Sequence, residues 1–509
     1  MPATYPKRLI EVDLPIRRIS AHARREKSIR HGHISTLHIW WARRPLAACR
    51  AVICASLWPD PADPLCPAAF IEVAKKEMRE WTTHERQSLL SEESRKRFAP
   101  ARTKKKAFED LIELRAALLD FIADFANWDS STVPEFLATS RVLTQAAHEA
   151  LGGAPGTRPL VVDPFCGGGS IPLEALRVGA DAFASDLNPV PVLLNKVVLE
   201  YIPKYGQRLA DEVRKWGEWI KREAEKELGE FYPKDADGAT PIAYLWARTI
   251  QCEGPGCGAE VPLVRTLWLA KKTNRSVAMQ LVPNAKAKRV DFQIIVKERD
   301  GWVDQANPKI KIENPKFEGA VKRGSATCPC CGYTTPVVRV REQLKTRHGG
   351  ANDARLMCVV STRENEQGRF YRQPTETDTK AIRVATAELV QRKKDHTGLL
   401  SLVPDEKLDI RGIRHTWAMI YGLNTWEHFF TRRQALALTS IARLLNNAGE
   451  KVKAKEGAEF AAALQSCLAM VLGRQADALS ASVTWTPGGE FQGHTFARQA
   501  LAFVWDLQK

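Results

Sequence analysis

The pattern of apolar and polar positions divides the chain into stretches of helical and strand-like character. Apolar residues at helical spacing predict helices over 68–150, over 197–228 and from 378 onward. Pro45 to Leu57 also predicts a helix, with proline in the first turn, where a missing N–H costs little. Between 246 and 345 the pattern changes to short runs typical of strands, such as DFQIIVKE and TPVVRVRE.

One segment, LVVDPFCGGGSIPLEALRVGADAFASDLNP at 160–189, combines both patterns. An apolar strand ends at Asp163, three glycines follow, IPLEALRVGA predicts a helix, and DAFASD predicts a second strand that ends at Asp186. This order, in which a strand is followed by a glycine turn, a helix and a second strand, predicts a parallel α/β unit. Such sheets bind ligands at the carboxyl ends of their strands.

The residues of this glycine turn indicate the kind of ligand. A dinucleotide fingerprint would read G-x-G-x-x-G, whereas this segment places Asp163 directly before Pro-Phe-Cys-Gly-Gly-Gly. A carboxylate there would repel a pyrophosphate and would suit a cationic sulfonium. Asp186, about 20 residues further on, has the position of an acid that binds ribose hydroxyls. The turn therefore favours S-adenosylmethionine over NAD, and the alternative is a tight turn without a ligand.

The net charge and the lack of a long apolar run narrow the class of protein. The 509 residues carry 75 Lys and Arg against 59 Asp and Glu, a net charge of +16, which predicts a polyanionic partner such as nucleic acid. Two basic clusters, Arg95–Lys106 and Lys271–Arg323, are candidates for phosphate contacts or are simply solvated surfaces. No apolar run reaches the ~20 residues needed to span a bilayer, and no secretory signal is found, so we expect a cytoplasmic protein without membrane contact.

Two groups of the 11 cysteines have the spacing of metal ligands. Cys252 and Cys257 form one pair, and Cys328 and Cys331 form a C-x-x-C-G knuckle about 70 residues later. Four thiolates make a closed tetrahedral zinc site of the structural kind. A β-rich basic insertion, 258–327, would then extend from the site. The alternative is two unrelated thiol clusters; Cys330 is not expected to be a ligand.

Several segments resemble a known family. DPFCGGGSIPLEA resembles the S-adenosylmethionine motif of amino-methyltransferases, and SDLNPVPVLLNK resembles their ribose-binding segment. DLPIRRISAHARREKSIRHGHISTLHIWWARRPLAACRAVI and TFARQALAFVWD resemble bacterial and archaeal adenine-specific DNA methylases that contain a zinc ribbon. The resemblance implies an α/β fold: a Rossmann-like S-adenosylmethionine-dependent methyltransferase core with helical additions and an inserted β-rich zinc ribbon.

The expected organisation has five segments. These are an N-terminal segment with a cofactor-capping helix (1–59), a basic helical insertion (60–155), the cofactor-binding core (156–245), the zinc-ribbon region (246–345) and a helical C-terminal region (346–509).

The resemblance also implies roles for individual residues. Asp186 would hold the ribose and Asn188 would flank the adenine, while Arg43 and Arg44 would face the cofactor carboxylate. The residues around the methionine part would be Asp163, Pro164, Phe165, Cys166, Gly167, Gly168 and Gly169, with Cys166 interpreted as a packing residue. The alternative is that Trp40 and Trp41 are core residues and the arginines are surface residues.

The sequence lacks the other half of the chemistry. Amino-methyltransferases hold the target amine with an Asp/Asn/Ser-Pro-Pro-Tyr/Phe/Trp motif, and this sequence has no Pro-Pro pair. The nearest match, NPKF at Asn314–Phe317, is interpreted as a loop. The catalytic residues are therefore unknown. We expect a DNA adenine N6-methyltransferase in truncated or split form, with a separate chain carrying the motif and a role in restriction–modification implied by the family. The alternatives are an RNA base methyltransferase and a non-catalytic cofactor- and DNA-binding subunit.

Overall fold

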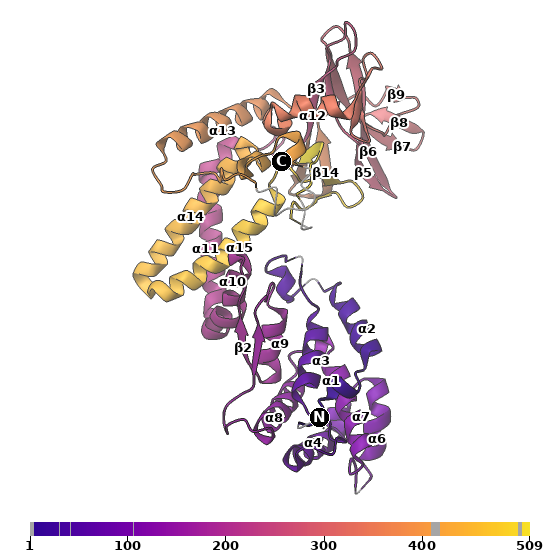
Figure 1. Cartoon of the computed structure of the whole chain (residues 1–509). Coiled ribbons are helices and arrows are strands. Elements are labelled where there is room, and N and C mark those ends of the chain that lie inside the picture. Colours follow the sequence, from indigo (N-terminus) through magenta and orange to yellow (C-terminus); the bar gives the residue numbers. More distant parts are fainter. Residues whose placement is uncertain are drawn as a thin grey trace. The chain divides into compact units, whose positions relative to one another are not determined.

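The chain divides into two compact units, Met1–Ala210 and Asp211–Lys509 (Figure 1). The computed structural model describes residues 5–29, 31–40, 42–104, 106–408, 418–496 and 501–508. The fold is mixed α/β, and its β-rich part lies in the second unit. The boundary between the units falls within the segment 156–245, which the sequence predicts to be a single core.

The first unit is mainly helical, as the pattern over 45–57 and 68–150 predicts. Its α-helices are α1 (Leu9–Val12), α2 (Ile16–Glu26), α3 (Leu46–Leu57), α4 (Ala68–Glu80), α5 (His84–Gln87), α6 (Glu92–Ala101), α7 (Leu111–Phe125), α8 (Pro134–Ala150), α9 (Ser170–Val178) and α10 (Pro189–Asn195). Most of them share one hydrophobic core, in which Trp81 contacts Phe121 and Phe136 and which also includes residues of α3 and α9. The segment 60–155 therefore packs together with the α/β unit in one core.

A buried ion pair ties α3 to α9, the helix that follows the glycine turn. The Arg50 guanidinium donates from Nε to Glu174 at 2.6 Å, and the side chains are 1% and 0% exposed. Arg50 also donates to the carbonyl of Phe125 and stacks over that ring. Removing one partner of such a pair would leave the other charge buried without compensation. The ion pair therefore fixes which faces of α3 and α9 meet.

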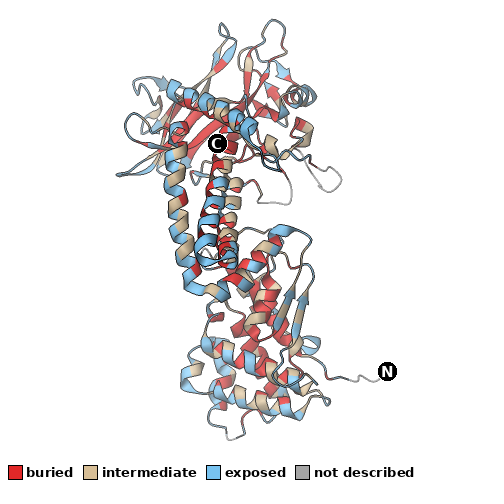
Figure 2. Ribbon diagram, turned by 90° about the vertical axis from the view of Figure 1, so that its left-hand side faces the viewer, coloured by how far each residue is buried: buried red, intermediate tan, exposed pale blue. Residues whose placement is uncertain are grey.

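The predicted strand–helix–strand unit is present, but its second strand ends at Ala184, two residues before the predicted end at Asp186. Strands β1 (Leu160–Asp163) and β2 (Asp181–Ala184) pair in parallel, with Val162 opposite Phe183 and Asp163 opposite Ala184. Among the described residues of the first unit, these are the only strands. One face of the pair packs on the core, and the other is open to solvent, with Leu160 61%, Val162 55% and Phe183 55% exposed (Figure 2).

The helix predicted over 197–228 is interrupted rather than continuous. Residues Lys196–Tyr201 form a π-helix, and α11 (Ile202–Leu228) follows with a non-helical backbone at Gly206 (φ 54°, ψ −135°). Glycine adopts this conformation without the steric cost that a side chain would impose. Apolar spacing detects the helical character but not the change in winding, because both forms present a similar apolar stripe.

The second unit is built on a ten-stranded mixed sheet, which confirms the predicted β-rich character of this region. The main path of the sheet is β14-β13-β3-β4-β7-β6-β5, with β8 and β9 added at β7 and β17 added at β3. Its strands are β3 (Thr240–Gln251), β4 (Glu260–Leu263), β5 (Trp268–Lys272), β6 (Arg275–Asn284), β7 (Arg289–Glu298), β8 (Gly301–Asp304), β9 (Lys311–Ile312), β13 (Arg355–Arg363), β14 (Glu366–Arg372) and β17 (Asp506–Gln508).

The described part of the second unit also contains two smaller sheets, four further α-helices and most of α11. The small sheets are formed by β10 (Val321–Lys322), β11 (Ser325–Thr327) and β12 (Thr334–Thr335), and by β15 (Trp485–Thr486) and β16 (Phe491–Gln492). The helices are α12 (Val337–Lys345), α13 (Glu376–Asp395), α14 (Arg432–Glu456) and α15 (Ala458–Ala478). The helical pattern from 378 onward is confirmed by α13, α14 and α15.

Two predictions for the second unit are wrong. TPVVRVRE forms only the end of a strand, and from Val337 it is the helix α12, whose Val340 and Leu344 are buried four residues apart. Alternation over four residues cannot distinguish a strand from this helical spacing. The region 346–509 is not purely helical either, because it contains β13, which pairs with β3, and β14, which pairs with β13. The local pattern does not show these pairings.

Two aromatic residues between α13 and α14 belong to the core, since Tyr421 and Phe429 are 5% and 1% exposed. Residues 409–417 lie outside the described part of the chain. Among the described residues, no helix is both long enough and apolar enough to cross a bilayer.

Candidate functional site

The glycine turn begins at the carboxyl end of β1 and forms the start of α9. The backbone is left-handed at Gly167 (φ 46°) and Gly169 (φ 79°), conformations that side chains disfavour. Asp163 accepts a hydrogen bond from the amide of Phe165 at 3.2 Å, and Gly169 donates to the carbonyl of Cys166 at 2.8 Å. The backbone itself therefore favours glycine at 167 and 169, independently of any ligand.

Asp186 lies beside this turn and binds it. Its carboxylate accepts from the Gly167 amide at 3.0 Å and from the Asn188 amide at 2.9 Å. Burial raises the pKa of the Cys166 thiol to about 11, and the charges of Asp163 and Asp186 both add to the shift. Both carboxylates therefore lie near Cys166. The structure brings the two predicted acids together at one end of the β1–β2 pair, where each remains half-buried.

Three side chains pack against the three glycines. A β-carbon placed on Gly167 would lie 2.8 Å from Trp40 Nε1, one on Gly168 would lie 2.8 Å from Arg43 Nε, and one on Gly169 would lie 2.6 Å from Asn195 Oδ1. Any of these contacts is shorter than real β-carbons tolerate. The glycine run is therefore explained by close packing as well as by backbone conformation.

Arg43 contributes a guanidinium with unused donors beside the turn. Its Nη2 donates to the carbonyl of His38 at 3.1 Å, while the buried Nε and Nη1 have no partner within the described residues. Burial lowers the pKa of Arg43 to about 10, and the negative charge of Glu26 opposes the shift, so the group stays protonated at neutral pH. A buried cation with free donors is costly unless it is paired.

Asn195 adds a second unsatisfied group to the same turn. The side chain is 6% exposed, and its Nδ2 donates to the carbonyls of Gly167 and Pro191. The Oδ1 atom is buried and has no partner within the described residues. Asn195 is the last residue of α10 and immediately precedes the π-helix, a form that is frequent at functional sites.

Glu26 organises the segment that carries Arg43. Its buried carboxylate accepts from the amides of Leu46 and Ala47, at the start of α3, and lies 2.8 Å from His33 Nε2. Burial alone would raise the pKa of Glu26, but these hydrogen bonds outweigh it and hold the pKa below its ordinary value. Because Glu26 occupies the first amides of α3, Arg43 rather than the helix start is the free donor facing the turn.

The remaining predicted cofactor residues are more exposed. Phe165 is 76% exposed, and Asn188 is exposed with its Oδ1 accepting from the Val190 amide as the N-cap of α10. The Arg44 side chain is exposed, and its carbonyl accepts from the Ser170 hydroxyl at 2.8 Å. Pro164 is also exposed, and its carbonyl accepts from Ser185. Trp41 lies outside the described residues.

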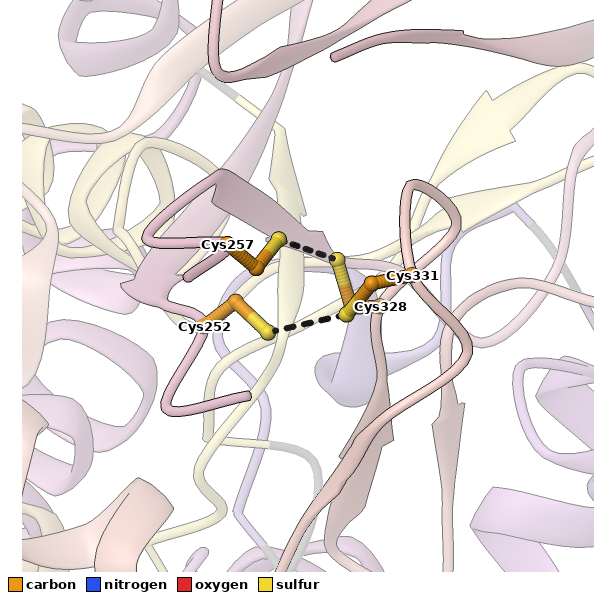
Figure 3. A group of neighbouring side chains, drawn as sticks. All are labelled: Cys252, Cys257, Cys328 and Cys331. Atoms are coloured by element: carbon orange, nitrogen blue, oxygen red, sulfur yellow. Dashed lines mark hydrogen bonds between the residues drawn. The ribbon is translucent and has the colours of Figure 1, made fainter. Parts of the chain in front are cut away.

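The four predicted zinc ligands converge in the second unit (Figure 3). The Sγ atoms of Cys252, Cys257, Cys328 and Cys331 all lie within 4.8 Å of one another, and two of the pairs are 3.5 and 3.9 Å apart. Tetrahedral zinc with bonds of about 2.3 Å would place thiolates about 3.8 Å apart, so the four residues fit this ion. Zinc bound there would cross-link β3 to the β11–β12 turn.

The surroundings of this cluster agree with a closed structural centre. Gly254 allows the close approach, because a β-carbon there would lie 2.8 Å from Tyr333 and 3.1 Å from Cys331 Sγ. Gly332 makes the turn after Cys331 with a φ of 78°. Cys330 is not part of the group, and its Sγ lies 3.6 Å from the carbonyl of Arg289. The strands between the two pairs form the β-rich insertion that the spacing predicts.

The first basic cluster is partly neutralised by its neighbours. Arg97 pairs with Asp120 at 2.7 Å and Lys104 with Glu113 at 3.6 Å, and Lys105 lies outside the described residues. Glu26, His33 and Asn195 were not among the site residues predicted from the sequence. A polar side chain at a buried helical position, such as Glu26 at the end of amphipathic α2, is the signal that could have identified the first of these.

Comparison with known proteins gives one match. Residues 13–91 match the model of a family described as a protein of unknown function (DUF1156), and this range contains Glu26, His33, Trp40 and Arg43. No curated protein and no solved structure matches the chain. A methylase family is not identified by these comparisons, so the resemblance described above stays a prediction.

Proposed function

We propose that the first unit binds S-adenosylmethionine at the glycine turn and that the protein is a DNA adenine N6-methyltransferase of the zinc-ribbon type. The observation that carries the proposal is the convergence of two carboxylates, three glycines and the free donors of Arg43 at the end of one parallel strand pair. Such a pair, with helix α9 between its strands, would serve as the first unit of a Rossmann-like sheet.

Each group has a chemical counterpart in this cofactor. The half-buried carboxylate of Asp163 would attract the sulfonium or the amino group, and Asp186 would accept from the ribose hydroxyls. The unused Nε and Nη1 of Arg43 would donate to the carboxylate of the methionine part. Bound there, the cofactor would supply an electrophilic methyl group for an exocyclic amine.

The open face of the β1–β2 pair supports the proposal that another polypeptide completes the core. Parallel sheets are normally covered on both faces, and two strands alone make a marginal sheet. Here Leu160, Val162 and Phe183 are more than half exposed, and Phe165 and Leu187, which follow the two strands, are 76% and 94% exposed. We propose that a chain bearing further apolar strands and the Pro-Pro motif covers this face.

Calorimetry tests cofactor binding. Asp163→Ala and Asp186→Ala are each expected to abolish binding of S-adenosylmethionine to the full chain. Asp181→Ala is the matched control, because Asp181 lies at the opposite end of β2 and is exposed. Unchanged affinity in the first two variants would exclude this site.

Methyl transfer tests the activity. Radiolabelled methyl groups should reach DNA only when a polypeptide with the Asp-Pro-Pro-Tyr motif is added. Transfer to tRNA or rRNA instead of DNA would favour the alternative of an RNA base methyltransferase. Cofactor and DNA binding without transfer under any condition would favour a non-catalytic subunit.

A further inference from the structure

An aromatic cluster lies on the open face of the β5–β9 part of the sheet. Trp268 stacks on Phe317 with ring centroids 4.3 Å apart and an interplanar angle of 15°, and Trp302 contacts both rings at 5.7 and 5.0 Å. All three side chains are half-buried rather than buried. Large aromatic groups that stay partly accessible, while their neighbours bury completely, are available to a ligand.

The strand register shows that this face is distinct from the core. Trp268 pairs with Ala278, which pairs with Ile295, so these residues project from one face. Val277, Met279 and Ile294 alternate to the opposite face and belong to the hydrophobic core of the sheet. The aromatic cluster therefore covers Ala278 and Ile295 on the face that the core leaves open.

Two lysines project from the same face beside the aromatic rings. Lys271 pairs with Ser276 on β6, and Lys297 pairs with Trp302 on β8, which places both lysines on the side of the tryptophans. Lys271 Nζ lies 5.1 Å from the centre of the Trp268 ring. Neither lysine takes part in an ion pair among the described residues, and both are exposed.

The charge around the cluster favours an anionic ligand. Residues 271–323 contain thirteen Lys and Arg against six Asp and Glu, so this segment has a clear positive excess. A hollow of about 670 Å³ lies between the β5–β6 and β7–β8 turns and is lined by Lys297 and Arg299, together with Glu298 and Asp300. Arg275 also lines it but is paired with Glu490. Lys297 lines this hollow and is paired with Trp302, so the hollow adjoins the aromatic cluster and offers a path for a phosphate backbone.

Phe317 is held in place by its neighbours along the chain. Its carbonyl accepts a hydrogen bond from the Leu267 amide at 3.0 Å. The adjacent residues Thr266 and Glu318 form an isolated antiparallel β-bridge. Gly319 has no room for a side chain, because a β-carbon there would lie 2.0 Å from the carbonyl oxygen of Val264. The NPKF segment thus positions Phe317 rigidly against Trp268, and an already ordered ring loses little conformational freedom when a ligand stacks on it.

We propose that Trp268, Trp302 and Phe317 form a stacking surface for the bases of single-stranded nucleic acid, with Lys271 and Lys297 contacting the phosphates. Aromatic side chains on an open sheet face, flanked by cations, bind unpaired bases in this way, whereas a base pair inside a duplex hides its faces. Such a surface differs from a general affinity for DNA, because it selects unpaired strands and holds them through these particular residues. The binding does not require the cofactor turn of the first unit.

Fluorescence anisotropy of the full chain with labelled oligothymidylate of about 20 nucleotides, without cofactor, tests the proposal. Trp302→Leu and Phe317→Leu keep an apolar cover but remove a ring, and each should weaken binding by about fivefold to a hundredfold. Trp216→Leu is the control, because Trp216 is a half-buried tryptophan that contacts Trp219 on α11. Oligouridylate in place of oligothymidylate shows which nucleic acid is preferred.

Two comparisons separate stacking from simple phosphate attraction. An abasic strand of equal length should bind more weakly than oligothymidylate, and Trp302→Leu should not weaken it further. Lys297→Gln, with Lys221→Gln on α11 as control, should lower the salt dependence of binding. Equal affinity of the wild-type chain for abasic, duplex and thymidylate strands would overturn the proposal, as would wild-type binding by both ring variants. Asp163→Ala, which tests the cofactor site, should bind oligothymidylate normally, so the two proposals fail separately.

Discussion

The packing of Arg43 against Gly168 allows the proposed cofactor site to be tested with one methyl group. In Gly168→Ala the new β-carbon would lie 2.8 Å from Arg43 Nε and 3.2 Å from Nη2, whereas ordinary contacts begin near 3.4 Å. The guanidinium must therefore shift by about 0.6 Å. The backbone at Gly168 is not left-handed, so alanine adds no conformational strain there.

The expected cost to folding is small and the expected cost to binding is large. A shifted Arg43 loses its hydrogen bond to the His38 carbonyl, which lowers the free energy of unfolding by about 1 kcal/mol. A charge-assisted hydrogen bond to a ligand carboxylate contributes about 1.5–3 kcal/mol. The dissociation constant for S-adenosylmethionine should therefore rise by about tenfold to a hundredfold.

Calorimetry with S-adenosylmethionine and urea unfolding measure these two quantities. Gly217→Ala is the control, because its β-carbon meets nothing within 4 Å on α11 and should leave the dissociation constant unchanged. Arg43→Lys should weaken binding to a similar extent without any steric clash, because lysine lacks the planar fork. Wild-type affinity in both Gly168→Ala and Arg43→Lys would refute the role assigned to Arg43.

Two further predictions concern the second unit. Cys328→Ser should lose bound zinc, measured by elemental analysis, and should increase amide hydrogen exchange over 250–340. Cys330→Ser should keep its metal, because Cys330 is not in the cluster. Full zinc content in Cys328→Ser would contradict the proposed zinc centre. Burial and the neighbouring His348 lower the pKa of His428, whose Nδ1 accepts hydrogen bonds from the Asn424 and Thr425 amides. The neutral imidazole therefore contributes stability above about pH 6.5, and this contribution is lost as the pH falls below that value. The melting temperature of the wild-type chain should accordingly fall between about pH 7 and pH 5, and His428→Asn should reduce this fall; an identical pH dependence in the variant would show that His428 is not involved.

The sequence by itself determined the local elements whose signal is short-range. The strand, glycine turn, helix and strand over 160–184 follow from adjacent residues, because the apolar run, the glycines and the helical spacing each act within one element. The four cysteines were likewise identifiable as one group, since two thiol pairs at knuckle spacing are typical of one metal site. The winding change at 196–206 and the helix at Val337 were not determined in this way.

Only the tertiary structure decided which distant groups meet at the glycine turn. Arg43 was placed there by resemblance, but its unused donors arise because Glu26 takes the first amides of α3 and leaves the guanidinium unpaired. Asn195, the last residue of α10, reaches the turn through the hydrogen bond from its Nδ2 to the Gly167 carbonyl, which no local pattern predicts. In the second unit, β13 pairs with β3 across more than 100 residues. The open aromatic face exists only once the registers of β5 with β6, β6 with β7 and β7 with β8 are set. Such contacts depend on which buried surfaces fit together, and that choice is made by the whole chain rather than by any one segment.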